Sequence, residues 1–403
     1  MNITFIVKEF PKTSETFIIS QVRGLLNLGH DVKVISLRKH RKTFTHLNRE
    51  LFDRIMYLGY EGNTLRRFIK TACVVISHGV YTDFLHHALK NRTLLSILSY
   101  PAIRSHFIDK ADIILVHYGD LACNFSFLNN IPGFKKPVVV VFHGVDVARY
   151  LPSLSPLERA RLWDTMTLGL PVSHFWLERL QSLGCPVEKL RVHHMGVDIE
   201  RFSLKRKFPL KNILRLVSVC RLVEKKGIDI AIQSIPKVLK AHPGVEIIYD
   251  IVGDGPERHK IENLAAFYNI QKRVVFHGEK SHQEVKKILE AANVFVLPSR
   301  TSGNGDMEGI PVSLMEAMSC GLAVVSTFHS GIPELVKNGI SGLLVDENDI
   351  DGIASALMRL ISEPDLVIRL GNNARKEVVK NFNYTHLNVE LESILKDIIV
   401  HYK

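Results

Sequence analysis

Residues 294–326 read VFVLPSRTSGNGDMEGIPVSLMEAMSCGLAVVS. Two short apolar runs, residues 294–297 and 323–326, have the length and the β-branched content of buried strands. Between them lie a loop rich in Ser, Gly and Asn and an apolar segment that stops at Gly321. Pro311 suits the first position of a helix and Gly321 suits the residue after its end, so this stretch predicts strand, loop, helix and strand.

The same alternation continues along the chain. Further strands are expected at residues 3–7, 31–36, 112–116, 138–142, 168–172, 213–219, 246–252, 273–276 and 342–345. Helices are expected at residues 15–28, 121–129, 175–183 and part of 51–100, and beginning near Gly227, Pro256, His282, Ile310 and Ile350. Continuous apolar strands that alternate with helices are typical of parallel sheets covered on both faces.

At 403 residues the chain exceeds what one hydrophobic core usually supports. Residues 196–212 are polar, basic and without a period, which marks a domain boundary. We therefore expect an α/β protein with two doubly wound domains, residues 1–200 and 201–382, followed by a helix at 383–403 that packs back on the first domain. Ligands of such sheets bind beyond the carboxyl ends of the strands, so a cleft between the two domains is the expected site.

Composition excludes several classes of protein. The chain is 46% hydrophobic and 23% charged, which is typical of a globular protein. Its five cysteines show no close pairing, which argues against a disulfide framework or a structural zinc site and favours a reducing compartment. The first ten residues read as a strand rather than a signal peptide, and no run approaches the ~18 apolar residues of a membrane span.

The net charge of +11 is concentrated in the first 150 residues, mainly at residues 38–42 and 66–70. A basic half suggests an anionic partner: a nucleic acid, a lipid surface or a phosphorylated substrate. Solvated loops and helix faces explain any single cluster equally well.

Two loops have residues suited to phosphate. Arg221 and Lys226 flank a loop after a predicted strand, where two cations of different geometry could hold a diphosphate. Gly253 and Gly255 follow the next strand and allow backbone to approach a ligand. The chain has no GxGxxG pattern and no Walker lysine, so neither dinucleotide binding nor nucleotide hydrolysis is favoured. Ordinary surface charge remains an alternative for the Arg221 and Lys226 pair.

Glu308 and Glu316 stand eight positions apart and allow three interpretations: an acid/base pair, two contacts to one long ligand, or a solvent-facing helix surface. The helix N-terminus presents N–H groups of Ile310, Val312 and Ser313, which suit an anion. The rise from Ile310 to Glu316 is roughly 9 Å. That separation is too long for the pair of a retaining glycosidase, at about 5 Å, and marginal for an inverting pair. Two contacts to one long ligand fit better, while a solvent-facing Glu316 stays open.

Longer stretches resemble a known family. Residues 298–327 and 331–345 resemble the signature of glycosyltransferase family 4, whose members are retaining enzymes with the GT-B fold of two Rossmann-like domains facing across a cleft. VSVCRLVEKKGID, IVGDGPE, VVFHG, GVDIERF and VVFHGVD extend the resemblance over most of the chain. FPKTSETFI near the start and VHYGD at 116–120 resemble the subgroup that builds bacterial exopolysaccharides such as colanic acid and amylovoran.

The resemblance implies roles for particular residues. Glu316 should hold the ribose of a nucleotide-sugar donor, and Glu308 should contact the donor sugar near its reacting carbon. Arg221 and Lys226 should neutralise the leaving diphosphate, and His143 should reach the donor sugar. The diphosphate should meet the backbone of Gly309, Ile310, Pro311 and Val312, with Gly253 and Gly255 nearby; His117 and Asp120 are acceptor-side candidates. Many members have a Gly-Gly loop after the first strand; here Pro11 to Glu15 replace it, with Ser14 a candidate helix cap and phosphate contact.

The implied function is a hexosyltransferase that moves a sugar from a UDP- or GDP-sugar, with retention, to a polyprenyl-diphosphate-linked saccharide in cell-surface polysaccharide biosynthesis. No cofactor and no metal are expected, because the sequence has no fitting DxD-like dyad. The basic first domain favours a cytoplasmic protein bound peripherally to the anionic inner membrane face. Two rival functions remain: a nucleotide-sugar epimerase or hydrolase, and a non-catalytic nucleic-acid-binding protein. No nucleic-acid partner is expected, since the basic clusters lack interleaved aromatic residues.

Overall fold

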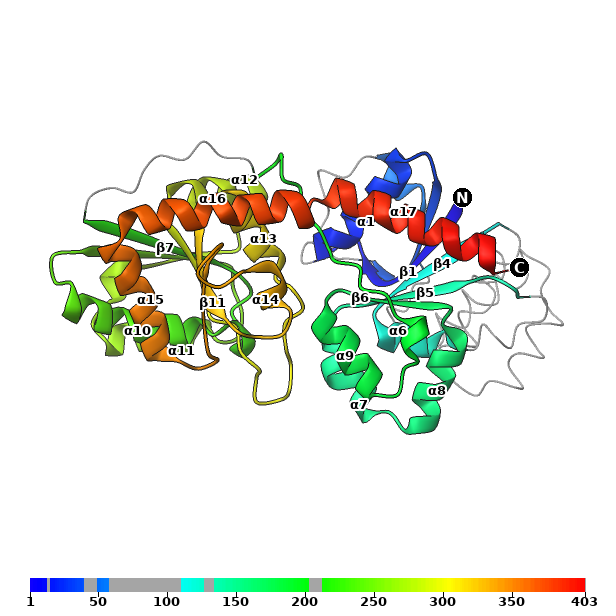
Figure 1. The fold of residues 1–403 in the computed structure, drawn as a ribbon, viewed down its shortest axis with the longest axis horizontal. Helices are drawn as coiled ribbons and strands as arrows, with labels where there is room; N and C mark the ends of the chain where they lie inside the picture. Colours follow the sequence, from blue (N-terminus) through cyan, green and yellow to red (C-terminus); the bar gives the residue numbers. More distant parts are fainter. Residues whose placement is uncertain (13–14, 40–48, 58–109, 127–133, 203–211, 403) are drawn as a thin grey trace. The chain divides into compact units, whose positions relative to one another are not determined.

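The computed structural model describes residues 1–12, 15–39, 49–57, 110–126, 134–202 and 212–402. These residues form two compact units (Figure 1). Unit 1 comprises residues 1–172, 176–193 and 386–403, and unit 2 comprises residues 173–175 and 194–385. No helix in the described part of the chain is long and apolar enough to cross a membrane.

Unit 1 is built on a parallel sheet in which the described strands take the order β3-β2-β1-β4-β5-β6. Its elements are β1 (Asn2–Phe10), α1 (Thr16–Asn27), β2 (Asp31–Lys39), α2 (Arg49–Phe52), β3 (Ile55–Tyr57), β4 (Ile113–His117), α6 (Gly119–Asn124), β5 (Val138–Phe142), η4 (Asp146–Tyr150), α7 (Leu151–Ser153), α8 (Pro156–Thr165), β6 (Leu168–Pro171), α9 (His174–Ser182), η5 (Val187–Lys189) and α17 (Tyr384–His401). Ser155 and Glu158 form a capping box that starts α8, a helix that the hydrophobic pattern alone did not predict.

Unit 2 has a second parallel sheet, in which the described strands take the order β12-β11-β10-β7-β8-β9. Its elements are β7 (Ile213–Val219), η6 (Glu224–Lys226), α10 (Ile228–Ala241), β8 (Glu246–Val252), α11 (Arg258–Phe267), η7 (Gln271–Arg273), β9 (Val274–Gly278), α12 (His282–Ala291), β10 (Val294–Leu297), α13 (Val312–Ser319), β11 (Ala323–Thr327), α14 (Ile332–Leu335), β12 (Leu343–Val345), α15 (Ile350–Ser362) and α16 (Pro364–Asn381). Helices α10, α11 and α15 cover one face of this sheet, and α12, α13 and α16 cover the other (Figure 1).

In both sheets, successive strands are added first on one side of the first strand and then on the other. In unit 1 the chain adds β2 on one side of β1 and β4 on the other; in unit 2 it adds β8 on one side of β7 and β10 on the other. This order is that of a doubly wound nucleotide-binding sheet, so the predicted fold class is confirmed for each unit. Ligands of such sheets bind at the carboxyl ends of the strands where the order reverses. The candidate sites therefore lie after β1 and β4, and after β7 and β10.

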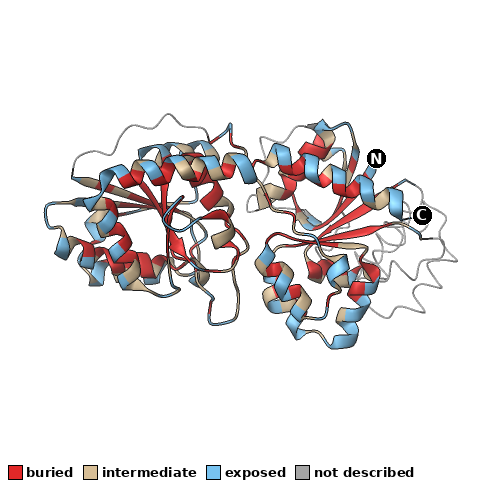
Figure 2. Cartoon of the chain, viewed as in Figure 1, coloured by how far each residue is buried: buried red, intermediate tan, exposed pale blue. Residues whose placement is uncertain are grey.

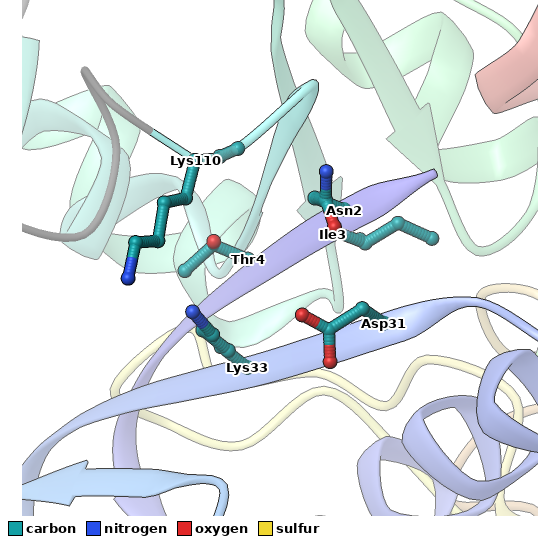
Figure 3. A pocket seen from close by; sticks show the side chains of 7 residues that line it. Asn2, Ile3, Thr4, Asp31, Lys33 and Lys110 are labelled. Carbon is teal, nitrogen blue, oxygen red and sulfur yellow. The ribbon is translucent and has the colours of Figure 1, made fainter.

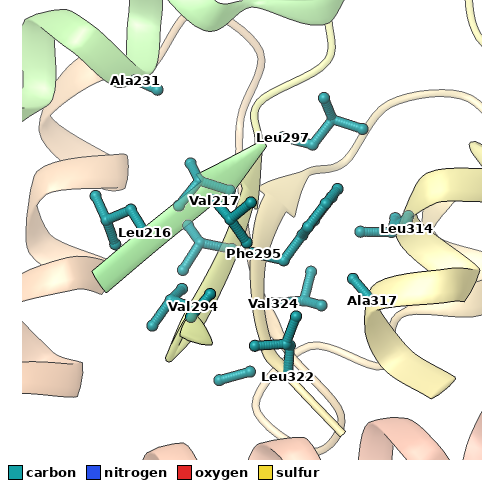
Figure 4. Close-up of a cluster of buried hydrophobic side chains, with 14 of the residues drawn as sticks. Leu216, Val217, Ala231, Val294, Phe295, Leu297, Leu314, Ala317, Leu322 and Val324 are labelled. Atoms are coloured by element: carbon teal, nitrogen blue, oxygen red, sulfur yellow. The ribbon is translucent and has the colours of Figure 1, made fainter. Parts of the chain in front are cut away.

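The cores lie between the sheets and their helices, so the strands are the most deeply buried elements (Figure 2). In unit 2, Phe295 and Val324 of neighbouring strands meet Leu314 and Ala317 of α13 (Figure 4). These four side chains are completely shielded from solvent. Burying a side chain of this size stabilises a fold by about 1.5–3 kcal/mol, so α13 is held firmly against β10 and β11.

Several element boundaries differ from the sequence prediction. Helix α13 begins at Val312, with Pro311 as its cap rather than its first residue. Helix α11 begins at Arg258, since residues 256–257 form a turn. The three-residue strand β3 (Ile55–Tyr57) lies within residues 51–100, part of which was expected to be helical; it was not predicted, because so short a strand has no visible period. The basic residues 66–70, and most of 38–42, lie outside the described residues.

Candidate functional site

A buried ion pair joins the two loops at the reversal point of the unit 2 sheet. Lys226, after β7, places Nζ 2.9 Å from Oε1 of Glu308, which ends the long loop after β10. Burial alone would lower the pKa of Lys226, but the carboxylate of Glu308 more than offsets burial and the pKa is raised. Burial likewise would raise the pKa of Glu308, yet Lys226 and Lys225 lower it. Both groups are therefore charged at neutral pH.

Lys225 supports the same loop from its other side. Its Nζ donates to Oδ1 of Asp306 at 3.1 Å and to the carbonyl of Met307 at 3.0 Å, and it lies 3.9 Å from Oε1 of Glu308. Two neighbouring lysines thus hold three consecutive residues, 306–308. Sequence reasoning singled out Lys226 and missed Lys225, although both stand in the same Glu-Lys-Lys-Gly turn.

The backbone of Glu308 is held by the turn after β11. Its N–H donates to Nε2 of His329 at 3.0 Å, and its carbonyl accepts from Oγ of Ser330 at 2.7 Å. His329 is completely buried and its Nδ1 lies 2.5 Å from Oε1 of Glu347. Sequence reasoning missed all three supporting residues, His329, Ser330 and Glu347, because polar residues in a turn have no periodic signal.

Next to Glu308 the start of α13 presents backbone donors. The N–H groups of Gly309, Ile310, Val312 and Ser313 donate to no residue that the structure describes. Pro311 has no N–H and contributes its fixed backbone angle as the helix cap. The first N–H groups of a helix have no partner within it and point along the positive end of its dipole. This arrangement suits a phosphate group.

Glu316 is buried on α13, with 9% of its surface exposed. Its carboxylate accepts no hydrogen bond from any described residue. Burial raises its pKa to about 7, although the charge of Arg201 acts in the opposite direction. The interpretation of Glu316 as a solvent-facing helix residue is therefore wrong: the polar stripe of this helix faces protein, not water. A buried carboxyl group without hydrogen bonds is costly unless a ligand supplies donors.

Arg221 lies in the loop after β7, is exposed, and forms no ion pair with a described residue. Gly253 and Gly255 lie beside this loop. A Cβ added at Gly253, whose φ is +122°, would lie 1.9 Å from the carbonyl oxygen of Cys220; one added at Gly255 would lie 2.3 Å from that of Leu222. These glycines therefore let the loop after β8 pack against the loop after β7. This close packing is a structural reason for glycine at both positions, in addition to the predicted approach of a ligand.

In unit 1, two candidate histidines form a pair. Nδ1 of His117, the last residue of β4, lies 2.9 Å from Nε2 of His143, which follows β5. The ring of His143 also packs against Phe17 and Tyr118, with centroid distances of 4.8 Å and 4.4 Å. Burial lowers the pKa of His143 to about 3 and lowers that of His117 well below its usual range. Both rings are neutral at physiological pH.

His117 is completely buried, and its Nε2 has no partner among the described residues. It was predicted as an acceptor-side candidate; in the structure its one described hydrogen-bond partner is His143. Asp120, the other acceptor-side candidate, forms an ion pair with Lys8 of β1. Ser14 lies outside the described residues; the neighbouring Glu15 pairs with Lys12 at 2.6 Å.

Asp146 is a further residue that sequence reasoning did not assign. Its buried carboxylate accepts the N–H groups of Gly119 at 2.7 Å, Gly144 at 2.8 Å and His143 at 3.1 Å. It thereby joins the loop after β5 to the start of α6. Burial raises its pKa to about 6, although the hydrogen bonds from Gly119 and Gly144 oppose the shift. The His-Gly-Val-Asp spacing was a usable signal, since an Asp often accepts N–H groups of its own turn.

A small pocket lies at the amino ends of β1 and β2, at the other end of the strands from the candidate site in unit 1. Asn2, Thr4, Asp31, Lys33 and Lys110 line it (Figure 3). Because ligands of doubly wound sheets bind at the carboxyl ends, this pocket is separate from the candidate site. Within the described residues, no group of three His, Cys, Asp or Glu side chains is placed to hold a metal ion.

Family models match nearly the whole chain. Residues 14–201 match "Glycosyltransferase Family 4" and residues 200–377 match "Glycosyl transferases group 1". Over 410 residues, 99% of this chain and all of the relative, the chain is 35% identical to WcaL of Salmonella typhimurium, which bears the name of a colanic acid biosynthesis glycosyltransferase. The chain belongs to glycosyltransferase family 4. The amylovoran biosynthesis glycosyltransferase AmsK of Erwinia amylovora is also 35% identical, covering 98% of this chain and 99% of the relative.

Two solved structures share the fold of this family 4 member. HepE of Anabaena, crystallised with UDP, aligns with a TM-score of 0.74 at 16% identity over 98% of this chain and 100% of its own. Sucrose-phosphate synthase of Thermosynechococcus elongatus aligns with a TM-score of 0.74 at 18% identity over 99% of both chains. The GT-B fold expected from the resemblance is confirmed, and the protein is a glycosyltransferase.

Proposed function

We propose that this glycosyltransferase moves a sugar from a UDP- or GDP-sugar, with retention of configuration, to a polyprenyl-diphosphate-linked saccharide during exopolysaccharide biosynthesis. The names of WcaL and AmsK, at 35% identity over the full chain, support the biosynthetic setting. The crystals of HepE with UDP and with UDP-glucose support a nucleotide-sugar donor.

The unpaired carboxyl group of Glu316 is the observation that carries the donor proposal. It is buried on α13 without a hydrogen bond from the described residues, and the backbone N–H groups of Gly309 and Ile310 directly precede the same helix. Two ribose hydroxyls of a nucleotide would supply the missing donors. The diphosphate would then lie against the start of α13, and the sugar would lie at Glu308.

In the proposed reaction the bond between the sugar carbon and the diphosphate oxygen breaks, and a bond to the acceptor oxygen forms on the same face. The acceptor proton passes to the leaving phosphate. Arg221, which has no carboxylate partner among the described residues, would neutralise the diphosphate together with the amides of α13. Lys226 would keep Glu308 ionised and fixed at the same place. This account needs no metal ion or cofactor.

Calorimetry against a panel of UDP- and GDP-sugars tests the donor site. We expect one nucleotide class to bind at micromolar concentration to the wild-type protein. Glu316→Ala should weaken this binding at least tenfold, whereas Glu363→Ala, a change at an exposed carboxylate of the same unit, should not. If no nucleotide sugar binds, or if Glu316→Ala binds as tightly as the wild type, the donor assignment fails.

The acceptor and the site of action are a further part of the proposal. A polyprenyl-linked acceptor and the net charge of +11 favour a cytoplasmic protein bound to the anionic inner membrane face. Flotation with vesicles of phosphatidylglycerol and phosphatidylcholine should show binding that weakens as salt rises. Absence of binding, or binding insensitive to salt, would contradict the membrane part and leave the donor part intact.

A further inference from the structure

The hydrogen bond from the backbone N–H of Glu308 shows which ring nitrogen of His329 carries no proton. A peptide N–H can only donate, so the Nε2 of His329 that lies 3.0 Å from the N–H of Glu308 must present a lone pair. Neither residue has much contact with solvent, since His329 is completely buried and Glu308 is 7% exposed. Loss of this acceptor would therefore leave the N–H of Glu308 buried and unpaired, which is unfavourable.

The other ring nitrogen of His329 faces a carboxylate. Nδ1 lies 2.5 Å from Oε1 of Glu347, and an ionised carboxylate only accepts, so the ring proton is on Nδ1. Burial would raise the pKa of Glu347, but hydrogen bonds from the N–H of Thr301 and from His329 outweigh burial and lower it. The carboxylate therefore stays an acceptor, and one neutral tautomer of His329 satisfies both of its neighbours.

This relay reaches both ends of the loop between β10 and α13. Glu347 accepts the N–H of Thr301 at 2.8 Å, near the beginning of the loop, and through His329 it controls the N–H of Glu308, near the end. Ser330 holds the carbonyl of Glu308 in the same turn. The backbone angle of Glu308 decides where its side chain points.

We propose that His329 is a positioning residue for sugar transfer: held in the Nδ1–H tautomer by Glu347, it fixes the backbone of Glu308 and thereby the carboxylate that meets the donor sugar. His329 touches no substrate in this proposal. The effect of His329 on the reaction rests on the proposed role of Glu308. The tautomer of His329 follows from its own hydrogen bonds and does not depend on that role.

Nitrogen NMR of the ligand-free protein tests the tautomer directly. Long-range proton–nitrogen spectra should show His329 with a protonated Nδ1 and a bare Nε2 at neutral pH. Glu347→Ala should release this preference. A ring protonated on Nε2, or on both nitrogens, would overturn the proposal. This measurement needs no substrate, so it stands even if the donor assignment fails.

Three variants then separate positioning from simple packing. His329→Gln can place its carbonyl oxygen near the position of Nε2 and accept from Glu308, whereas His329→Asn is too short and His329→Leu has no acceptor. We expect His329→Gln to retain kcat within about tenfold. His329→Leu and His329→Asn should lose on the order of 100-fold in kcat, the usual consequence of displacing a reacting group by about 1 Å. Binding of the free nucleoside diphosphate should change little, since Glu308 is assigned to the sugar.

His259→Leu is the matched control, because His259 lies in the same unit with its side chain 94% exposed. Wild-type kcat in folded His329→Leu, or equal losses in the Gln and Leu variants, would overturn the positioning role. If His329→Leu does not fold, the Gln and Asn pair and the nitrogen spectra still decide the question. Failure of the wild type to bind any nucleotide sugar would instead refute the proposed function.

Discussion

His117 and His143 lie edge to edge through one nitrogen each, with Nδ1 of His117 2.9 Å from Nε2 of His143. Nε2 of His143 is thus already paired with His117, and Nδ1 is the ring nitrogen of His143 left for a ligand. His117 itself is completely buried, so we expect it to affect a ligand only through His143.

This pairing predicts different results for two amide substitutions. The side-chain amide of asparagine lies near the position of Nδ1, while that of glutamine extends toward Nε2. We expect His143→Asn to retain about tenfold more kcat/KM for transfer than His143→Gln, measured with the donor identified by calorimetry. His401→Asn, an exposed change in the same unit, should behave like the wild type. Equal losses at His143 in both variants would show that Nδ1 has no special role.

Glu316 predicts a dependence of stability on pH. Its pKa in the folded protein is raised to about 7, above the ordinary 4.5, so the folded state binds the extra proton. Stability should therefore fall as the pH rises from about 4.5 to about 7. At pH 8 the Glu316→Gln protein should be more stable by on the order of 2 kcal/mol, or about 5 °C in a thermal melt. At pH 4 the two proteins should be alike, and Glu363→Gln should show no such difference.

The same carboxyl group predicts the pH dependence of donor binding. Ribose hydroxyls donate best to the ionised form, so affinity for the nucleotide should rise as the pH increases through about 7. Calorimetry at pH 6 and pH 8 should show this rise in the wild type and its loss in Glu316→Gln. A pH-independent affinity in the wild type would argue against an ionised Glu316 as the ribose contact.

The ion pair of Lys226 and Glu308 predicts non-additive stability changes. Lys226→Met leaves the carboxylate of Glu308 buried without its closest cation, which should cost about 3–5 kcal/mol. Lys226→Met combined with Glu308→Leu should cost less than the sum of the two single changes, as measured by urea unfolding. Lys237→Met removes an exposed ion pair with Asp351 and should cost about 1 kcal/mol or less. Additive costs would mean that the two buried charges do not interact.

Close backbone packing predicts which glycines are essential. Gly227→Ala would bring Cβ to 1.9 Å from the carbonyl oxygen of Pro298, at a φ of +64°. Gly227→Ala and Gly253→Ala should each cost several kcal/mol, seen as a large drop in melting temperature. Gly244→Ala meets nothing within 4 Å and has no left-handed φ, so it should be neutral or slightly stabilising. A tolerated Gly227→Ala would contradict the observed contact between these loops.

The sheets were predictable because their strands are continuous apolar runs. Residues 138–142, 213–219 and 246–252 were predicted with the bounds that the structure has. Glu316 was harder, since helical spacing gathers it with Ser313 and Ser319 on one polar stripe, and such stripes usually face water. Here α16 packs against α13, and Arg375 of α16 donates to the carbonyl of Ser319. The periodicity of a helix shows which residues share a face, but it does not show whether another helix covers the polar face.

Residues whose partners are distant in the sequence were harder to predict. His329 meets Glu308 from 21 positions away, and its role depends on the tautomer that Glu347 selects. His117 was noted for its place in a motif, but only packing showed that it stands behind His143. Single histidines in turns have no spacing pattern, so their partners appear only when strands β10, β11 and β12 are placed side by side.

The position of α17 has a consequence for biosynthesis of the protein. This helix belongs to unit 1: its Glu392 lies 2.7 Å from Nε2 of His30, and Asn388 occupies the space over Gly24 of α1. Leu391 and Leu395 are completely shielded there. Residues 386–402 leave the ribosome after all of unit 2, so the half that is translated first is completed last. A chain that stops near Thr385 should keep an intact second half, which includes the buried Phe382, and expose apolar surface on the first, where chaperones and proteases would act.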